Sequence, residues 1–319
     1  MEFAEIIGHE KEIRMIMEYF HTGRLPHALL FVGPPGIGKK TIAIKLARYL
    51  LCRKKIGNDN CLSCKKIEKG AHPDFLMIGG GGEALGIETI RWVCQETQRS
   101  PYLESRRVVI IDEAHLLTLE AANALLKTLE EPKEYNLFIL VTSEEGEIPL
   151  TVRSRCVKIP FSPIKLELIK NYLIEKHGLD ENKAEVVSNL SFGSLNVALF
   201  WANKENFLMR KKLAECLLGT KRSAVEITFF SEKISRNESE MYLYFLICLF
   251  RDMFVYSVTK EMSRVYNKDL LNILRQRVME PTLIREKIEL IIKTLSLLKY
   301  NVNRWTLFEN LLISLADGI

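Results

Sequence analysis

The sequence predicts an α/β domain, in which helices flank a parallel sheet, followed by two smaller helical domains. Up to about residue 160, short apolar runs alternate with stretches of helical spacing. A glycine-rich loop joins the first apolar run to a helix, and the rest of the chain has helical periodicity. We therefore expect domains at residues 1–162, 163–205 and 206–319, because a chain of 319 residues is long for a single core.

The first element is the apolar run Ala28–Val32, which is typical of a buried parallel strand. A glycine loop follows it, and a helix is predicted from Thr41 to Leu50. In this context backbone N–H groups and the positive helix N-terminus surround phosphate oxygens, and Lys39 is expected to reach the β- and γ-phosphates of ATP. The candidate ATP-binding residues here are Gly33, Pro34, Pro35, Gly36, Ile37, Gly38, Lys39, Lys40 and Thr41.

Lys40 departs from the usual pattern of such a loop. That position is normally Ser or Thr, whose hydroxyl binds the Mg²⁺ of Mg-ATP. The hydroxyl of Thr41 is one alternative, but it lies about 100° further round the helix. The other is that the Lys40 ammonium group takes the place of the metal, so that ATP binds weakly or without productive Mg²⁺. We favour the second and expect impaired hydrolysis.

The apolar strand predicted at Arg107–Ile111 ends in two carboxylates. In a phosphate-loop site the first, Asp112, helps to hold Mg²⁺, and the second, Glu113, polarises the attacking water. A strand that ends in a charged helix cap is the simpler alternative. The glycine loop upstream favours the nucleotide-site interpretation.

A helix is expected between Thr118, its N-cap, and Pro132, which stops it. The apolar run Leu137–Ser143 then predicts another buried strand. Thr142 lies at the carboxyl end of that strand, where parallel sheets place ligand contacts, and is a candidate sensor of the bound nucleotide.

The second half of the chain is predicted to be helical. Ser162-Pro163 marks the end of the α/β domain, and the next segment holds a helix at Leu166–Leu173 and another after Gly193-Ser194. Further helices are expected at Leu208–Leu218, Met241–Tyr256, Leu270–Val278, Leu283–Leu298 and Trp305–Leu315.

This series of motifs resembles the bacterial clamp-loader branch of the AAA+ ATPases. The members of this branch are subunits of DNA polymerase III. By motif the resemblance covers roughly residues 1–200, and beyond them it rests on length and helical character. The motifs that carry it are Ile7-Gly8-His9-Glu10, Leu25-Pro26-His27-Ala28, the glycine loop, Asp112-Glu113-Ala114-His115, the helix segment from Asn123 to Pro132, and Ser154-Arg155-Cys156.

The resemblance implies a role for each domain and for one arginine. The domains would be a nucleotide-binding AAA+ domain, a small helical lid and a helical collar that joins the subunits. The arginine of Ser154-Arg155-Cys156 would act in trans, stabilising charge at the ATP of a neighbouring subunit. The nearby Arg153 would be a surface or phosphate contact.

Within the branch the chain is most similar to the delta-prime type of subunit. Lys40 replaces the metal-binding hydroxyl, and Asn196 stands where motor subunits carry an arginine that contacts the γ-phosphate. Such a subunit helps a hetero-pentamer, with gamma or tau motors and delta, to load the sliding clamp onto primed DNA, and its own ATPase is weak or absent. The alternative is the ATP-hydrolysing gamma or tau motor, which the intact Asp112-Glu113 pair favours. The motifs disfavour an AAA+ remodelling protein outside replication.

Seven cysteines in scattered positions predict a reducing cytoplasm rather than a disulfide scaffold. In the family, a four-cysteine zinc site often lies where this chain has Cys52, Cys61 and Cys64, but the fourth position is Ile67. Glu68 or His72 could supply the fourth ligand; otherwise this is a loop with thiols and no metal. Because structural zinc normally takes four ligands, the missing one argues against zinc.

The composition fits a cytoplasmic protein. The richest apolar run, Met241–Phe250, is shorter than the ~18 residues of a membrane span and is followed by Arg251. The acidic start lacks the apolar segment of a signal peptide. The net charge of +5 is compatible with contact to the DNA backbone, and no sequence-reading DNA motif is apparent.

Overall fold

The computed structural model describes residues 3, 5–54, 57, 61–219, 224–236, 238–276, 279–298, 300 and 302–317. The chain divides into two compact units, Met1–Lys165 and Leu166–Ile319, and each is described by itself. The division into domains at residues 162 and 205 stays a prediction.

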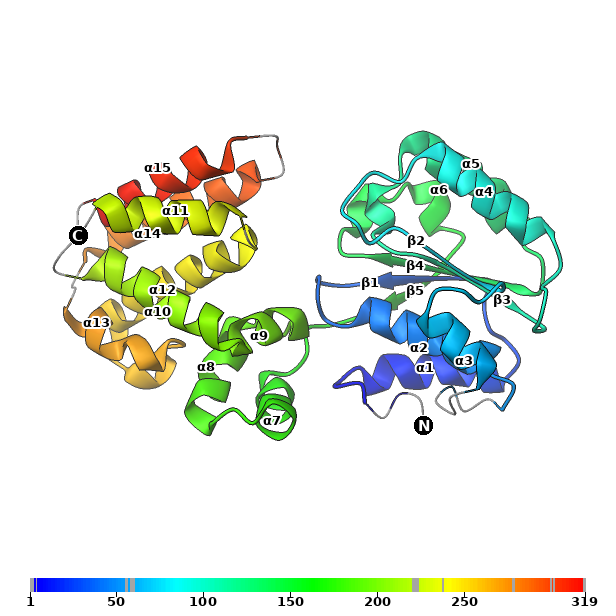
Figure 1. Cartoon of the computed structure of the whole chain (residues 1–319), viewed down its shortest axis with the longest axis horizontal. Coiled ribbons are helices and arrows are strands. Elements are labelled where there is room, and N and C mark those ends of the chain that lie inside the picture. Colours follow the sequence, from blue (N-terminus) through cyan, green and yellow to red (C-terminus); the bar gives the residue numbers. More distant parts are fainter. Residues whose placement is uncertain are drawn as a thin grey trace. The chain divides into compact units, whose positions relative to one another are not determined.

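The first unit is built around a five-stranded sheet of strand order β2-β3-β4-β1-β5, in which every pair of neighbours is parallel (Figure 1). The predicted parallel α/β class is therefore confirmed. The strands are β1 (Ala28–Val32), β2 (Phe75–Ile78), β3 (Arg107–Ile111), β4 (Asn136–Thr142) and β5 (Val157–Pro160).

Helices cover both faces of this sheet (Figure 1). On one face, α1, α2 and α3 pack against alternate residues of the strands, such as Leu29 and Phe31. On the other, α4, α5 and α6 pack against the residues between them, such as Ala28 and Leu30. The helices of this unit are α1 (Glu10–His21), α2 (Lys39–Leu51), α3 (Leu62–Glu68), α4 (Ile87–Gln98), α5 (Leu119–Glu130) and α6 (Leu150–Arg153), with short 3₁₀ turns η1 (Ala114–Leu116) and η2 (Glu145–Glu147).

The central strands are apolar on both sides because both faces of the sheet are covered. Every residue of β3 and β4 is buried. The predicted cap of α5 is confirmed, since the Thr118 hydroxyl accepts a hydrogen bond from the Ala121 N–H at 3.2 Å. The carboxyl ends of β3, β4 and β1, which are neighbours in the sheet, therefore meet at one edge.

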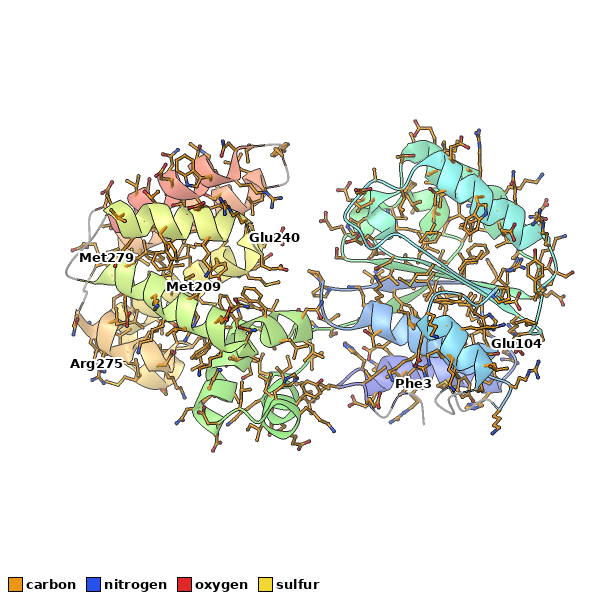
Figure 2. The ribbon with its side chains drawn as sticks, viewed as in Figure 1. Phe3, Glu104, Met209, Glu240, Arg275 and Met279 are labelled. Atoms are coloured by element: carbon orange, nitrogen blue, oxygen red, sulfur yellow. The ribbon has the colours of Figure 1, made fainter. Side chains whose placement is uncertain are left out.

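The second unit is helical, as predicted. Its side chains fill the space between the helices, where Met209 is buried (Figure 2). The helices are α7 (Leu166–His177), α8 (Glu181–Leu190), α9 (Leu195–Ala202), α10 (Lys204–Leu218), α11 (Ala224–Arg236), α12 (Ser239–Thr259), α13 (Leu271–Gln276), α14 (Pro281–Leu297) and α15 (Arg304–Ala316), with 3₁₀ turns η3 (Met262–Arg264) and η4 (Lys268–Leu270).

The seven helices expected in this half are all present, and α8 and α11 are additional. The predicted helix at Leu270–Val278 corresponds to α13, and residues 277 and 278 lie outside the described part of the chain.

Helix α12 is longer than the apolar run that marks it in the sequence. It continues through Arg251 and Asp252, whose side chains pair at 2.8 Å. Among the described residues it is the one helix whose length and composition would allow it to cross a membrane. Half of its most apolar window is buried inside the unit, and core helices of water-soluble domains meet the same criteria.

Candidate functional site

The predicted nucleotide-site residues of the first unit gather at the carboxyl edge of the sheet. The glycine loop follows β1, Asp112 and Glu113 follow β3, and Thr142 ends β4. The Gly33 N–H donates to the Thr142 carbonyl at 3.3 Å, so the loop starts beside the candidate sensor. Parallel pairing therefore brings three separate segments of the sequence together at this edge.

Lys39 lies folded back into its own loop. Its side chain is buried, and the ammonium group donates to the carbonyls of Gly33 at 2.6 Å and Pro34 at 2.5 Å. Burial lowers the pKa of Lys39 to about 8, and the nearby Asp112 carboxylate acts in the opposite direction. A phosphate would replace these carbonyls as the partner of the ammonium group.

Lys40 pairs with Asp112, the residue predicted to help hold Mg²⁺. Its Nζ lies 2.9 Å from Oδ2 of Asp112, whose side chain is only 11% exposed. The other carboxylate oxygen of Asp112 accepts the N–H of Glu113 at 3.0 Å. The Lys40 ammonium group therefore forms an ion pair with Asp112, and its place in a metal site stays a prediction. Thr41, the alternative metal ligand, is exposed.

A run of four glycines after β2, Gly79–Gly82, contacts both acidic residues. A Cβ on Gly80 would lie 2.6 Å from Nζ of Lys40 and 2.7 Å from Oδ2 of Asp112, so the ion pair rests directly against this backbone. The N–H of Gly82 donates to Oε2 of Glu113 at 2.9 Å. Sequence reasoning assigned no chemistry to this run. The pattern that could have indicated its place in the site is four glycines directly after an apolar strand.

Glu113 has a left-handed backbone with φ 52°, which is uncommon for a residue other than glycine. One oxygen of its carboxylate, Oε2, accepts the Gly82 N–H at 2.9 Å. The two carboxylates of the site thus both have partners from within the chain.

Thr142 is almost fully buried, at 1% exposed. Its hydroxyl accepts the Glu144 N–H at 3.0 Å and lies 3.3 Å from Nδ1 of His115. His115 belongs to the segment that follows Asp112 and Glu113. The threonine hydroxyl therefore joins the segment after β3 to the loop after β4, and its role as a sensor stays a prediction.

His9 is a contact of the glycine loop that sequence reasoning did not assign to the site. Its Nε2 lies 2.9 Å from the Ile37 carbonyl, and its ring packs edge-on against Phe161 with centroids 5.2 Å apart. Its left-handed φ of 64° turns the chain into α1 at this point. In the sequence, the Gly8-His9 pair marks this position, but it served only as one of the motifs of the family resemblance.

Arg155 lies at the surface, just after α6. Its guanidinium donates to Oε1 of Glu130 at 2.5 Å and to the Thr151 carbonyl at 2.8 Å, and its side chain stays 34% exposed. Glu130 ends α5. Sequence reasoning did not identify Glu130 as the partner of Arg155. The acidic Glu-Glu-Pro end of the helix is the sequence feature that could have indicated it. The contacts hold the guanidinium in place and leave part of it accessible.

Arg153 and Asn196 are the remaining residues that the family motifs singled out. Arg153, the last residue of α6, is partly buried, and its Nε has no hydrogen-bond partner in the described part of the chain. Asn196 lies in the first turn of α9, in the second unit, and is exposed.

The sulfur atoms of Cys52, Cys61 and Cys64 converge, all within 4.8 Å of one another. Within the residues that the structure describes, neither suggested fourth ligand joins this cluster. Glu68 pairs with Arg48 at 3.0 Å, and His72 accepts the Asp74 N–H at Nδ1 while its buried Nε2 has no partner in the described part of the chain. Ile67, at the family's fourth position, is buried and apolar. Among the described residues, a four-ligand zinc site is therefore one ligand short.

Comparison with known proteins identifies similar chains. The family model described as DNA polymerase III, delta subunit, matches residues 8–165. The DNA polymerase III subunit delta' of Bacillus subtilis (strain 168) is 28% identical over 96% of this chain and 95% of its own length. The DNA polymerase III subunit gamma of Buchnera aphidicola subsp. Schizaphis graminum is 36% identical over 62% of this chain. Only 56% of that gamma subunit is spanned by the match.

A solved structure has a similar fold over most of its length. It is a DNA polymerase III, gamma subunit-related protein from Thermotoga maritima, with a TM-score of 0.51 and 19% identity. The match covers 95% of this chain and 98% of the other. At this identity the likeness concerns the fold alone.

Proposed function

We propose that this chain is the delta-prime-type subunit of a clamp loader. The chain belongs to the DNA polymerase III clamp-loader family, and it matches a delta-prime subunit over nearly its full length. In this role it helps a complex to place the sliding clamp onto primed DNA during replication. Its partners would be gamma or tau motors and delta in a hetero-pentamer, together with the clamp. Contact with DNA would be made through the complex, in the cytoplasm.

The single observation that carries the non-motor role is the Lys40–Asp112 ion pair at 2.9 Å. In an active phosphate-loop ATPase, a hydroxyl and this carboxylate serve Mg²⁺. Here the carboxylate is paired with an ammonium group, and one carboxylate oxygen of Glu113 accepts the Gly82 N–H. The site keeps the loop and Lys39 that bind phosphate, so we propose binding of ATP with little or no turnover.

Arg155 would be the chemical contribution of this chain to catalysis. Its guanidinium is oriented by Glu130 and Thr151 and remains partly exposed, as a group that reaches a neighbouring subunit must be. A cation supplied in trans stabilises the charge that develops on the transferred phosphoryl group. Thr142 would report the state of the chain's own nucleotide, whereas Asn196 stands in place of the second sensor arginine of the motors.

The rival function is that of a gamma or tau motor. The Asp112-Glu113 pair and the 36% identity to a gamma subunit favour it. Against it stand the ion pair at the metal position and Asn196 in place of a sensor arginine. We therefore retain it as the second candidate.

The three converging cysteines are proposed to remain thiols without zinc, because the fourth ligand is absent from the described residues around them. Metal analysis of the purified chain tests this. One zinc ion per chain would contradict it.

Reconstitution tests the proposed assembly. A loader prepared from the motor and delta subunits of the same organism should co-elute with this chain on gel filtration, and clamp loading onto primed DNA should depend on it. A loader that forms and loads clamps equally well without the chain would contradict the proposal.

The affinity for ATP should fall as the pH rises above about 8. Lys39 is charged below its lowered pKa and neutral above it, so the attraction to phosphate is present at low pH and lost at high pH. We expect the dissociation constant to rise by up to about tenfold per pH unit beyond that point, measured by calorimetry. In the Lys39→Arg variant, whose guanidinium stays charged, this dependence should disappear; an equally steep rise there would contradict the assignment.

A further inference from the structure

We infer, building on the proposed nucleotide site, that its ligand is the metal-free nucleoside triphosphate, with the Lys40 ammonium group in the place of Mg²⁺. Mg²⁺ is the ion that this type of fold implies, and the residues around Lys40 do not fit it. The inference follows from the ligands available, the space around them and the balance of charge.

The ligands do not suit a metal ion. Mg²⁺ takes oxygen ligands in a strict octahedral arrangement. At the position of the usual hydroxyl this chain has an ammonium group, which has three donors and no acceptor. It lies 2.9 Å from the carboxylate oxygen that would bind the ion, and its charge repels a second cation.

The ammonium group itself fills the position beside the carboxylate. The Gly79-Gly80 backbone packs against Asp112 and Lys40: a Cβ on Gly79 would lie 2.1 Å from the main-chain carbonyl oxygen of Asp112, and one on Gly80 would meet both members of the ion pair. Both glycines have left-handed φ values, 82° and 84°, which allow this close approach. The backbone thus lies directly against the Lys40–Asp112 pair.

The charge of the site suits a nucleotide that brings no cation. ATP without Mg²⁺ carries two more negative charges than Mg-ATP. Lys39 and Lys40 are adjacent in the first turn of α2, which contains no acidic residue, and the N-cap Gly38 has no side chain to occupy the N–H groups there. The phosphates of a bound nucleotide would therefore meet two ammonium groups and a helix N-terminus. Asp112 offsets the charge of only one ammonium group, that of Lys40.

Equilibrium dialysis with ATP tests the inference on the purified full chain, once in excess EDTA and once in millimolar Mg²⁺. We expect wild type to bind ATP at least as tightly in EDTA as in Mg²⁺. Binding that is about tenfold or more tighter with Mg²⁺ would overturn the inference, and so would the absence of ATP binding under both conditions.

Two substitutions at the same position act as matched variants. Lys40→Thr restores the hydroxyl and frees Asp112, so its affinity should become dependent on Mg²⁺, by about tenfold or more. Lys40→Met removes the charge without a new metal ligand, so it should lose affinity in EDTA and gain nothing from Mg²⁺. If both variants behave as wild type does, Lys40 has no such role. Melting curves without nucleotide check that each variant is folded.

This measurement is separate from the test of the proposed function. Dialysis concerns the chain's own site, whereas assembly and the effect of Arg155 concern the partner subunits. A Mg²⁺-dependent site in a chain that still assembles into the loader would overturn the inference and leave the delta-prime role in place. Failure to assemble would overturn the role, whatever the dialysis showed.

Discussion

Replacing Arg155 by alanine should reduce ATP turnover at the neighbouring site of the assembled loader by about 10³-fold or more, the effect of removing a trans-acting arginine. The guanidinium lies at the surface and is oriented by Glu130 and Thr151, so its loss should leave the fold of the chain intact. DNA- and clamp-stimulated hydrolysis by the reconstituted loader measures the effect, with assembly verified by gel filtration.

Two further variants identify the role of this arginine. Arg153→Ala, in the same segment, should leave the turnover close to wild type. Glu130→Gln removes one charged partner of Arg155 and should lower the turnover by a smaller factor than Arg155→Ala does. An unchanged rate in the Arg155→Ala loader, with assembly intact, would remove the trans role from this chain.

The second large effect is a gain of activity. Lys40→Thr should raise ATP hydrolysis at this chain's own site in the assembled loader by at least about tenfold, because a hydroxyl and an unpaired Asp112 could then bind Mg²⁺. The remaining contact of Glu113 with the Gly82 N–H should keep the rate below that of a motor subunit.

Thr41→Ala is the matched control for this gain. If the Thr41 hydroxyl served a metal ion in the wild-type chain, removing it would lower turnover; the exposed position of Thr41 predicts no change. Should wild type hydrolyse ATP at its own site as fast as Lys40→Thr does, the non-motor interpretation is wrong.

The parts of the site that could be predicted from the sequence are those that lie next to a recognisable strand. β1 begins and ends where its apolar run does, and β3 leads directly into Asp112. Because parallel strands end at one edge of the sheet, the convergence of the glycine loop, Asp112 and Thr142 followed from strand assignments alone. The proximity of Lys40 to the metal position followed from its place beside Lys39.

The contacts that could not be predicted join segments far apart in the chain. Gly82 reaches Glu113 and Arg155 reaches Glu130 through turns whose geometry has no simple sequence pattern. β2 and β5 have only four residues each, and such short runs carry little periodicity. The convergence of three cysteines likewise depends on the fold, although their family motif indicated it.

The most direct test of the central claim is the ATP turnover of a reconstituted loader in which this chain carries Lys39→Ala. This change removes the lysine that binds phosphate at the chain's own site and leaves Arg155 untouched. If the chain acts on a neighbour's ATP and not on its own, an intact loader should hydrolyse ATP at the wild-type rate. A fall in turnover, with assembly unchanged, would contradict the claim that this chain contributes to hydrolysis only through Arg155.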